Sequence, residues 1–402
     1  MLVLFLIFLL LYALPKILID RKQLTFIRQK LDAPAVILNH EDYHKAGLYA
    51  IEKLRFSIFS TLFECALFAL WLGVGFGILE RAFVDMSEEM ASLCFLLGFL
   101  VIHTLINAPL SYYLTMVLDK RFGFSTTSNA LFFKDLIQGL VLLVLFGALI
   151  GYALIHFALY LEYWWVYAFA FVLLLVIGVN MIYPTLIAPI FNKFTPLEDE
   201  SLKLRIEELM GQVGFRSSGI FVMDASKRDG RLNAYFGGLG KSKRVILFDT
   251  LLKKLSNDGI LAILGHELGH FKHKDIVKNL CFNAVFLFAL FAFIGLGVRE
   301  VLAFGGLELH IGGVFAFIFL ISPLIGFYLM PLLGALSRRA EYRADEFGAS
   351  ISSKMTLANA LVRIINENKS FPHSHPWYVF FHYTHPPLLE RLRALGYQIE
   401  NH

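Results

Sequence analysis

Seven long apolar stretches constrain what this chain can fold into more than any other feature of its sequence. Each is long enough to cross the hydrocarbon core of a bilayer as a helix. They lie near residues 2–19, 56–79, 91–117, 136–161, 164–183, 279–298 and 312–336. Charged residues make up 17% of the chain, against about 25% in soluble proteins, and they gather between the stretches. The sequence therefore predicts an all-α integral membrane protein with seven transmembrane helices.

Lysine and arginine residues predict the topology of these helices. When the loops are assigned alternately to the two sides of the membrane, every lysine and arginine except Arg81 and Arg299 falls on one side. Cytoplasmic loops carry such an excess, so this side is predicted to be cytoplasmic. It includes residues 184–278 and the C-terminus. Because basic residues accompany the end of the first stretch, that stretch is interpreted as an uncleaved anchor with its N-terminus outside.

The remaining composition narrows the classes of partner and cofactor. A formal net charge of +4 gives no reason to expect nucleic acid as a partner. Cys65, Cys94 and Cys281 all fall in apolar stretches, where cysteine behaves as a small buried hydrophobe. Neither a disulfide framework nor a thiolate metal site is predicted.

The main segment between membrane spans, residues 184–278, is predicted to form a small α+β insertion on the cytoplasmic side. Apolar spacing indicates a helix over Glu198–Val213, and Gly219–Met223 and Arg244–Phe248 are typical of short strands. The glycine-rich residues 233–243 indicate a hairpin. The chain is thus divided into four parts: residues 1–183 with the first five spans, the insertion 184–278, the last two spans in 279–336, and a C-terminal helical segment, 337–402.

A metal-binding pattern lies near the end of this insertion. Residues 266–270 read H-E-L-G-H, and positions four apart lie on one face of a helix, so His266 and His270 can both bind one metal ion. Glu267 can reach a water molecule on that ion. Two imidazoles, a carboxylate base and an open position are the arrangement of zinc proteases. The alternative is a chance pair of histidines in a core helix.

A catalytic zinc needs one more protein ligand, and the seventh apolar stretch continues into a candidate source. Glu341 and Asp345 lie four residues apart, on one face of a helix. Glu341 as a ligand completes a His₂Glu set, and Asp345 can accept a hydrogen bond from a ligand histidine or take part in proton transfer. The alternative is an ordinary amphipathic helix. His273, one turn after His270, is interpreted as a surface or interfacial residue.

A histidine and an arginine near the C-terminus are further candidates. His385 precedes two prolines and can hydrogen-bond the oxyanion that forms at the zinc. Arg391 can bind a substrate carboxylate, or it can pair with Glu341 or Asp345. As isolated residues, both are more often structural. The other histidines of this segment are not expected to bind metal; they are His373, His375 and His382.

A few polar residues lie inside the apolar stretches, where ionisable groups are costly unless they face protein or water. They are Glu64, His103, Asn107, His156 and Asn180. They line a wet interior cavity on one interpretation and make ordinary interhelical hydrogen bonds on the other.

Several motifs together resemble those of the type I CAAX prenyl endopeptidases, a family of integral membrane zinc metallopeptidases. The matching segments are 119–125, 183–196, Asn233–Phe236, 245–251, His266–His270, Glu341–Asp345 and 384–387. The resemblance implies one Zn²⁺ per chain, with His266, His270 and Glu341 as ligands. It also implies Glu267 as the catalytic base and a supporting or proton-donating role for Asp345.

The same resemblance implies that Asn233 and His385 contact the peptide backbone at the scissile bond. It implies a large water-filled chamber among the helices, with the zinc site at its cytoplasmic end. The expected function is a membrane zinc endopeptidase that removes the last three residues of prenylated C-a-a-X proteins. Its partners are then membrane lipid and a peptide or protein substrate, in a bacterial inner membrane or the endoplasmic reticulum. Two alternatives are a general quality-control protease of membrane proteins and a non-enzymatic scaffold.

Overall fold

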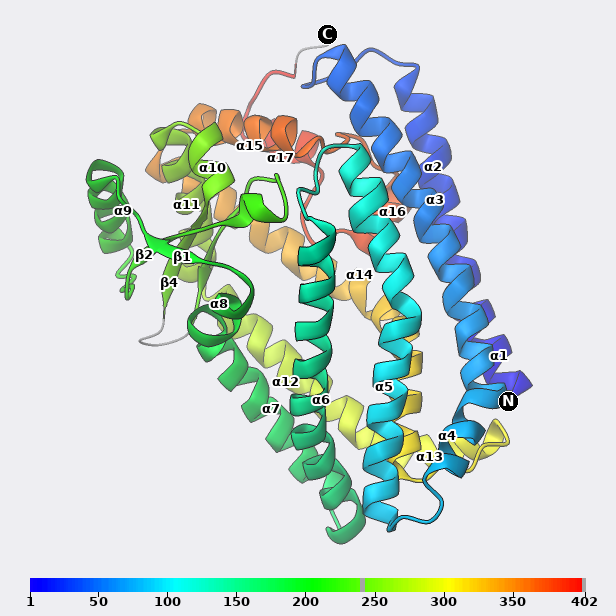
Figure 1. The fold of residues 1–402 in the computed structure, drawn as a ribbon. Helices are drawn as coiled ribbons and strands as arrows, with labels where there is room; N and C mark the ends of the chain where they lie inside the picture. Colours follow the sequence, from blue (N-terminus) through cyan, green and yellow to red (C-terminus); the bar gives the residue numbers. More distant parts are fainter. Residues whose placement is uncertain (239–242, 400–402) are drawn as a thin grey trace.

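The structure is a computed structural model, and it describes residues 1–238 and 243–399. Within these residues, seven helical segments are long and apolar enough to cross a membrane (Figure 1). They are Leu2–Leu31, His40–Ala82, Glu88–Asp119, Asn129–Tyr160, Trp164–Phe191, Asp275–Leu296 and Ile311–Ile351. The predicted stretches fall within these segments to within two residues, which confirms the seven-helix membrane fold.

Short π-helical turns divide three of these segments into shorter α-helices, and a fourth such turn ends the segment Glu88–Asp119. The α-helices before the sheet are α1 (Leu2–Phe8), α2 (Leu14–Leu31), α3 (His40–Leu70), α4 (Phe76–Ala82), α5 (Glu88–Tyr112), α6 (Asn129–Tyr160), α7 (Trp164–Ile182) and α8 (Ala188–Phe191). Local capping fixes the starts of the long ones: the side chain of Asn39 accepts from the Asp42 N–H, and that of Ser128 from the Leu131 N–H.

The two ends of the helical bundle differ in what they carry. The N-terminus lies beside α13 (Val298–Phe304), because the Met1 ammonium donates to the Gly305 carbonyl. Figure 1 places α4 at this same end, and α4 and α13 carry Arg81 and Arg299. The sheet and the C-terminal helices lie at the other end. The two isolated arginines therefore lie at the opposite end of the bundle from the sheet, as the charge pattern predicts. Which end faces the cytoplasm stays a prediction.

A mixed four-stranded sheet forms the β part of the insertion. Its strands are β1 (Phe194–Pro196), β2 (Ile220–Met223), β3 (Ala234–Gly237) and β4 (Arg244–Phe248), in the order β1-β2-β4-β3. β2 and β4 are parallel, whereas β1–β2 and β3–β4 are antiparallel. The strands β2 and β4 and the helix α9 (Glu200–Gln212) confirm the predicted elements. β3 and β4 pair as the predicted hairpin requires, and residues 239–242 between them lie outside the described residues.

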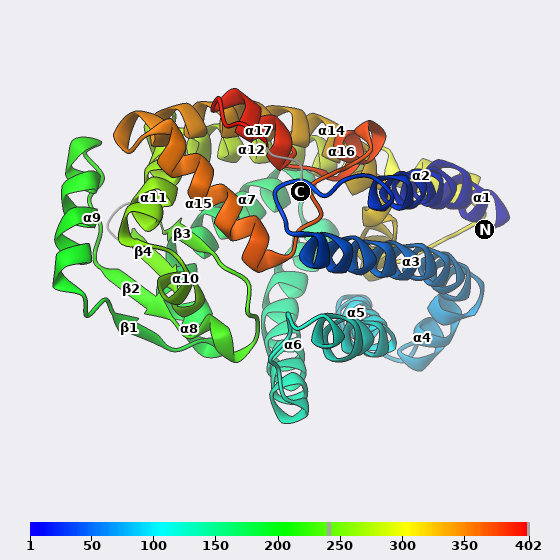
Figure 2. The same ribbon diagram turned by 90° about the horizontal axis from the view of Figure 1, so that it is seen from above.

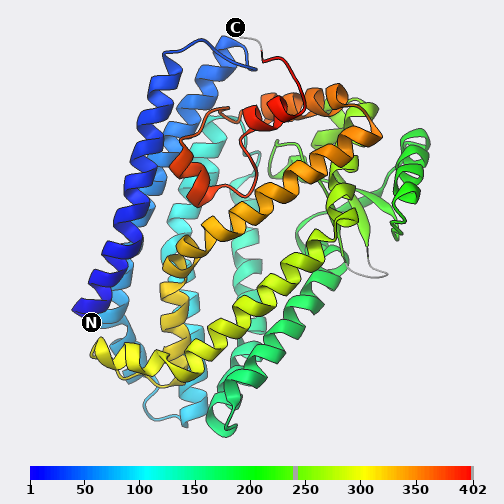
Figure 3. The ribbon, with the colours of Figure 1, turned by 180° about the vertical axis from the view of Figure 1, so that it is seen from behind.

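The remaining helices follow the sheet along the chain. They are α10 (Asp249–Lys254), α11 (Asn257–Lys272), α12 (Asp275–Leu296), α14 (Ile311–Ile351), α15 (Lys354–Asn368), α16 (Pro376–His382) and α17 (Leu388–Ala394). Apolar residues of the sheet, α9, α11, α15 and α17 form one core. Figure 3 shows α14 continuing from the membrane bundle up to this core, and its internal Pro323 and Pro331 account for its change of direction. Residues 400–402, which end the chain, lie outside the described residues.

Candidate metal centre

The helix α11 presents the H-E-x-x-H residues to α14. It begins where the Ser256 side chain accepts from the Gly259 N–H, and it buries Leu264 and Leu268 completely. His266 is buried and His270 is half-buried, on the face that packs against α14. The segment thus forms the predicted helix.

Small residues let α11 and α14 approach closely at this point. A Cβ added at Gly269 would lie 2.8 Å from the Ala344 Cα, and one added at Gly348 would lie 2.9 Å from the His266 backbone N. Both distances are shorter than van der Waals contact, so neither position accepts a larger side chain without moving a helix. The close crossing brings the side chains of His266 and His270 to those of Glu341 and Asp345.

Three side chains converge at the crossing with metal-ligand chemistry. One ligand atom from each of His266, His270 and Glu341 lies within 4.8 Å of the others. The Nε2 atoms of His266 and His270 lie 3.4 and 3.3 Å from the two Glu341 oxygens. Ligands of a tetrahedral zinc at about 2.1 Å stand about 3.4 Å apart. The spacing of these atoms therefore fits a single zinc ion.

Hydrogen bonds behind the histidines also favour a metal in front of them. His266 Nδ1 lies 2.8 Å from Asp345 Oδ1, and His270 Nδ1 lies 3.1 Å from Asp275 Oδ2. A carboxylate partner holds the proton on Nδ1 and leaves the Nε2 lone pair free to bind a metal. Glu341 Oε2 is buried without a hydrogen-bond partner among the described residues. This oxygen, which among those residues has only ion-pair contacts at 3.4 Å to His266 and Arg391, still has capacity to bind a metal.

Asp275 is a site residue that sequence reasoning missed. It follows Lys274, whose φ of 57° is left-handed, and this turn reverses the chain from α11 into α12. The reversal returns Asp275 to the side of His270. The only signal in the sequence is an acidic residue five positions after the second histidine. That spacing has no meaning until the turn is known.

Arg391 pairs with carboxylates of the site and does not stand free to bind a substrate. Its Nε and Nη2 donate to the two Asp345 oxygens at 2.8 and 2.6 Å, and its Nη1 lies 3.4 Å from Glu341 Oε2. Asp345 therefore links Arg391 to His266. Of the two sequence interpretations of Arg391, the geometry favours the ion pair.

Glu267 differs from the other carboxylates of the site in having no hydrogen-bond or ion-pair partner among the described residues. Its side chain is half-buried next to His266 and His270. Burial raises its pKa above the ordinary glutamate value, although the two histidines oppose the shift. Burial alone would lower the pKa of His266, but hydrogen bonds to Asp345 and Glu341 outweigh it and raise this pKa to about 9. Glu267 is therefore a carboxylate without a bonding partner among the described residues, and its affinity for a proton is raised.

The other candidate residues lie at different distances from the centre. His385 Nε2 is 3.3 Å from Glu341 Oε1, while its Nδ1 contacts Thr384 Oγ1 at 3.0 Å. Asn233 is exposed at the start of β3, where its side chain accepts from the Ala234 N–H. Among the described residues, no hydrogen bond or ion pair joins Asn233 to the three metal-ligand candidates. His273 lies outside the cluster, at the end of α11.

The sequence left two interpretations of the polar residues inside the membrane helices, a wet cavity and hydrogen bonds within the protein. Both occur. Glu64 accepts from the Tyr12 hydroxyl at 2.7 Å and lines a cavity. His103 packs against aromatic rings, and its Nδ1 is buried without a partner among the described residues. His156 lies 2.8 Å from Glu89. Two asparagines donate to carbonyls one turn back in their own helices: Asn107 to His103 and Asn180 to Val176.

Comparison with known proteins matches nearly the whole chain. The family described as CAAX prenyl protease N-terminal, five membrane helices, matches residues 23–193, and Peptidase family M48 matches residues 196–399. The CAAX prenyl protease 1 of Saccharomyces cerevisiae is 35% identical over 397 residues, covering 90% of this chain and 87% of that protein. The Homo sapiens homolog is 33% identical over 417 residues, covering 89% and 87%.

A solved structure agrees with these relatives. The crystal structure of S. mikatae Ste24p has a TM-score of 0.85 and 33% identity, and the match covers 95% of this chain and 96% of that one. Family and fold both favour the endopeptidase over a non-enzymatic scaffold. The chain belongs to peptidase family M48 and is an integral membrane zinc metalloendopeptidase.

Proposed function

We propose that this enzyme hydrolyses peptide bonds near the C-terminus of prenylated C-a-a-X proteins, with one Zn²⁺ held by His266, His270 and Glu341. The observation that carries the proposal is the convergence of these three side chains beside an unpartnered Glu267. The names of the relatives, which are CAAX prenyl proteases, support the substrate class. Lipid and a peptide or protein substrate are the partners.

The side chains around the centre each have a defined task in this reaction. Bound zinc supplies Lewis-acid chemistry toward a water molecule and the scissile carbonyl. The Glu267 carboxylate takes the proton from that water and delivers it to the leaving amine nitrogen. Asp345 and Asp275 hold the ligand imidazoles in the tautomer with Nε2 free. His385 donates from Nε2 to the developing oxyanion.

The substrate backbone has a place to bind in this proposal. β3 lies at the edge of the sheet and pairs only with β4 among the described strands. Figure 2 shows β3 and β1 at the two opposite edges of the sheet, with β1 beside α8. An extended peptide can add to this edge by backbone hydrogen bonds. Asn233, at the start of β3, then holds the carbonyl next to the scissile bond.

Two carboxylate variants test the metal centre. Glu267→Gln removes the base and leaves the ligands intact, so we expect full zinc content and a loss of kcat of about 10²-fold or more. Glu341→Gln removes a ligand and is expected to lower bound zinc. Glu346 is an exposed glutamate on α14, the helix that carries Glu341. Glu346→Gln is the matched control and is expected to keep both the zinc content and kcat. Near wild-type kcat in Glu267→Gln would refute the assignment of the base.

The oxyanion contact is tested separately. His385→Ala is expected to lower kcat/KM tens-fold or more, about 2 kcal/mol of transition-state stabilisation, with zinc content unchanged. Equal activity with unchanged zinc would instead show that the segment before α17 is purely structural.

The substrate class is tested by comparing kcat/KM for one C-a-a-X peptide with and without a farnesyl group, with Glu267→Gln as the blank. A large preference for the farnesylated peptide supports a dedicated CAAX enzyme. Similar values for the two peptides support a general quality-control protease. If neither is cut while zinc is fully bound, the proposed substrate class is wrong.

A further inference from the structure

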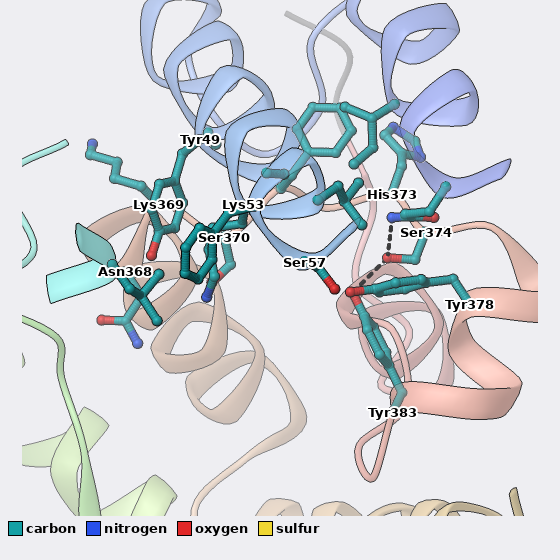
Figure 4. Close-up of a pocket in the computed structure, with 18 of the residues that line it drawn as sticks. Tyr49, Lys53, Ser57, Asn368, Lys369, Ser370, His373, Ser374, Tyr378 and Tyr383 are labelled. Carbon is teal, nitrogen blue, oxygen red and sulfur yellow. Dashed lines mark hydrogen bonds between the residues drawn. The ribbon is translucent and has the colours of Figure 1, made fainter. Parts of the chain in front are cut away.

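A cavity of about 640 Å³ lies between α2, α3 and the segment that joins α15 to α16. Figure 4 shows Tyr49, Lys53 and Ser57 of α3 facing Lys369 and Ser374 of that segment and Tyr383, which follows α16. Its volume is within the range of pockets that bind small ligands. The mechanism above makes no use of it.

Cations outnumber anions in the walls of this cavity. The lining residues with formal charge are Lys16, Lys53, Arg231, Lys369 and Glu64. Three of the four cations are paired with carboxylates: Lys16 with Asp20 at 3.4 Å, Arg231 with Asp119 at 3.2 Å and Lys369 with Asp42 at 2.5 Å. These pairs leave Lys53 as the lining cation that is available to an anionic ligand.

Lys53 is the lining cation that forms no ion pair among the described residues, although Asp119 and Asp229 attract it from a longer distance. Among the described residues, no carboxylate lies within ion-pair distance of its ammonium. Its described contact is with the Tyr49 ring, whose centroid lies 5.4 Å from Nζ. The side chain is exposed where it lines the cavity. An exposed ammonium without an ion-pair partner is accessible to an anionic group that enters the cavity.

A second cavity connects this one to residues beside the metal centre. This second cavity, of about 450 Å³, shares Ser370, Phe371, Ser374 and Tyr383 with the first, and His385 and Arg391 line it. On the side of the sheet, Arg231 of the first cavity stands two residues before Asn233. The space around Lys53 is thus bounded by the chain segments that lead into both proposed substrate contacts.

The direction in which a peptide adds to β3 decides where its C-terminus lies, and the proposal takes the antiparallel direction. A peptide that lies antiparallel to β3 carries the residues after its scissile bond past Asn233 toward Arg231. Three extended residues span about 10 Å. A substrate cut three residues from its end therefore presents its terminal carboxylate on the side where the cavity lies.

We propose that Lys53 binds the free C-terminal carboxylate of the substrate and so sets where the enzyme cuts. The inference rests on the proposed function and adds to it a second anchor, beyond the metal centre. Lys53 holds the C-terminal end of the substrate in place, and the bond that then lies at the metal centre is the one that is cut. An anionic lipid headgroup at Lys53 is the competing occupant.

The test compares two farnesylated peptides that differ only in ending with a carboxylate or a carboxamide. Wild-type enzyme is expected to favour the carboxylate in kcat/KM by about 10-fold to 100-fold, as for a charge-assisted hydrogen bond. Lys53→Gln is expected to reduce this ratio to about threefold or less while still cutting the amide peptide, and Lys53→Arg to keep most of it. Binding of both peptides to Glu267→Gln, with and without Lys53→Gln, should show the same pattern without turnover.

Arg55→Gln is the matched control, because Arg55 lies on the same helix, pairs with Glu52 at 2.6 Å and does not line the cavity. It should keep the wild-type ratio. Equal rates for both peptides in the wild-type enzyme would overturn the proposal. So would equal losses for both peptides in Lys53→Gln, which is the result expected for a lipid headgroup at this position. If wild-type enzyme with full zinc cuts neither peptide, the proposed function itself fails.

Discussion

At the scale of single residues, the two zinc-facing histidines are held by carboxylates from different helices. Asp345 belongs to α14, whereas Asp275 begins α12 and also contacts Arg343 at 3.1 Å. Each carboxylate fixes one imidazole tautomer, so neither histidine can turn away from the metal without losing a hydrogen bond. The metal centre therefore joins three helices, α11, α12 and α14.

Asp275→Asn tests this role of Asp275. The substitution keeps the size of the side chain but removes the charge that favours Nδ1–H on His270. We expect zinc affinity to fall by about 10-fold to 100-fold, measured by competition with a chelator of known affinity. Asp258→Asn, which changes an exposed aspartate at the start of α11, is the control and should leave the affinity unchanged. Equal affinity in both variants would contradict the role.

His373 is predicted to make the protein sensitive to acid. Burial, with Lys30 and Arg393 adding to it, lowers its pKa to about 4 from 6.5. The unfolded chain therefore binds a proton on this residue at a higher pH than the folded chain does. The stability contributed by neutral His373 is complete above pH 6.5 and is lost as the pH falls toward 4.

We expect the wild-type enzyme to lose about 1–2 kcal/mol more stability between pH 7 and pH 5 than His373→Asn. The measurement is thermal unfolding in detergent at both pH values. Parallel decreases in the two proteins would show that His373 does not titrate as its surroundings indicate.

At the scale of elements, the α11–α14 crossing sets the geometry of the metal centre. Gly269→Ala would force a methyl group against the Ala344 backbone, and separating the helices would move Glu341 away from both histidines. We expect a loss of about 1–3 kcal/mol in stability together with weaker zinc binding. Thermal unfolding and zinc titration are the measurements.

Gly211→Ala is the matched control for this prediction. It also replaces a helical glycine, but a Cβ there meets no atom within 4 Å. Alanine favours a helix over glycine by up to about 1 kcal/mol, so this variant should be unchanged or slightly more stable. If Gly269→Ala behaved like Gly211→Ala, close packing at the crossing would not be what holds the site.

Elements that depend on local pattern could be predicted from the sequence, and those that depend on chain reversals could not. Helical spacing was sufficient for α9, α11 and the extension of α14 beyond the membrane. β1 was missed because its three residues are too few to show alternation. Asp275 was missed because its position depends on the left-handed Lys274. Lys53 was missed because residues far apart in the chain form its cavity.

At the scale of the whole molecule, the separation of charge between the two ends of the bundle supports one orientation in the membrane. The end with α4 and α13 carries the two isolated arginines, and the end with the sheet carries the metal centre. Composition and hydropathy were sufficient to predict seven spans, because lipid requires every backbone group of a span to be bonded internally. The water-filled chamber implied by the family and the division into four parts stay predictions.

Cysteine labelling in intact cells tests the orientation. Asp85, between α4 and α5, and Glu207, on α9, are both exposed and lie at opposite ends of the molecule. In a variant whose three native cysteines are replaced by serine, we expect Asp85→Cys to react with a membrane-impermeant maleimide from outside. Glu207→Cys should react only after permeabilisation, because moving the many lysines and arginines near the sheet to the outer face opposes the positive-inside tendency. The parent variant without cysteine gives the background. Labelling of Glu207→Cys in intact cells, with Asp85→Cys protected, would invert the topology and place the metal centre on the outer side.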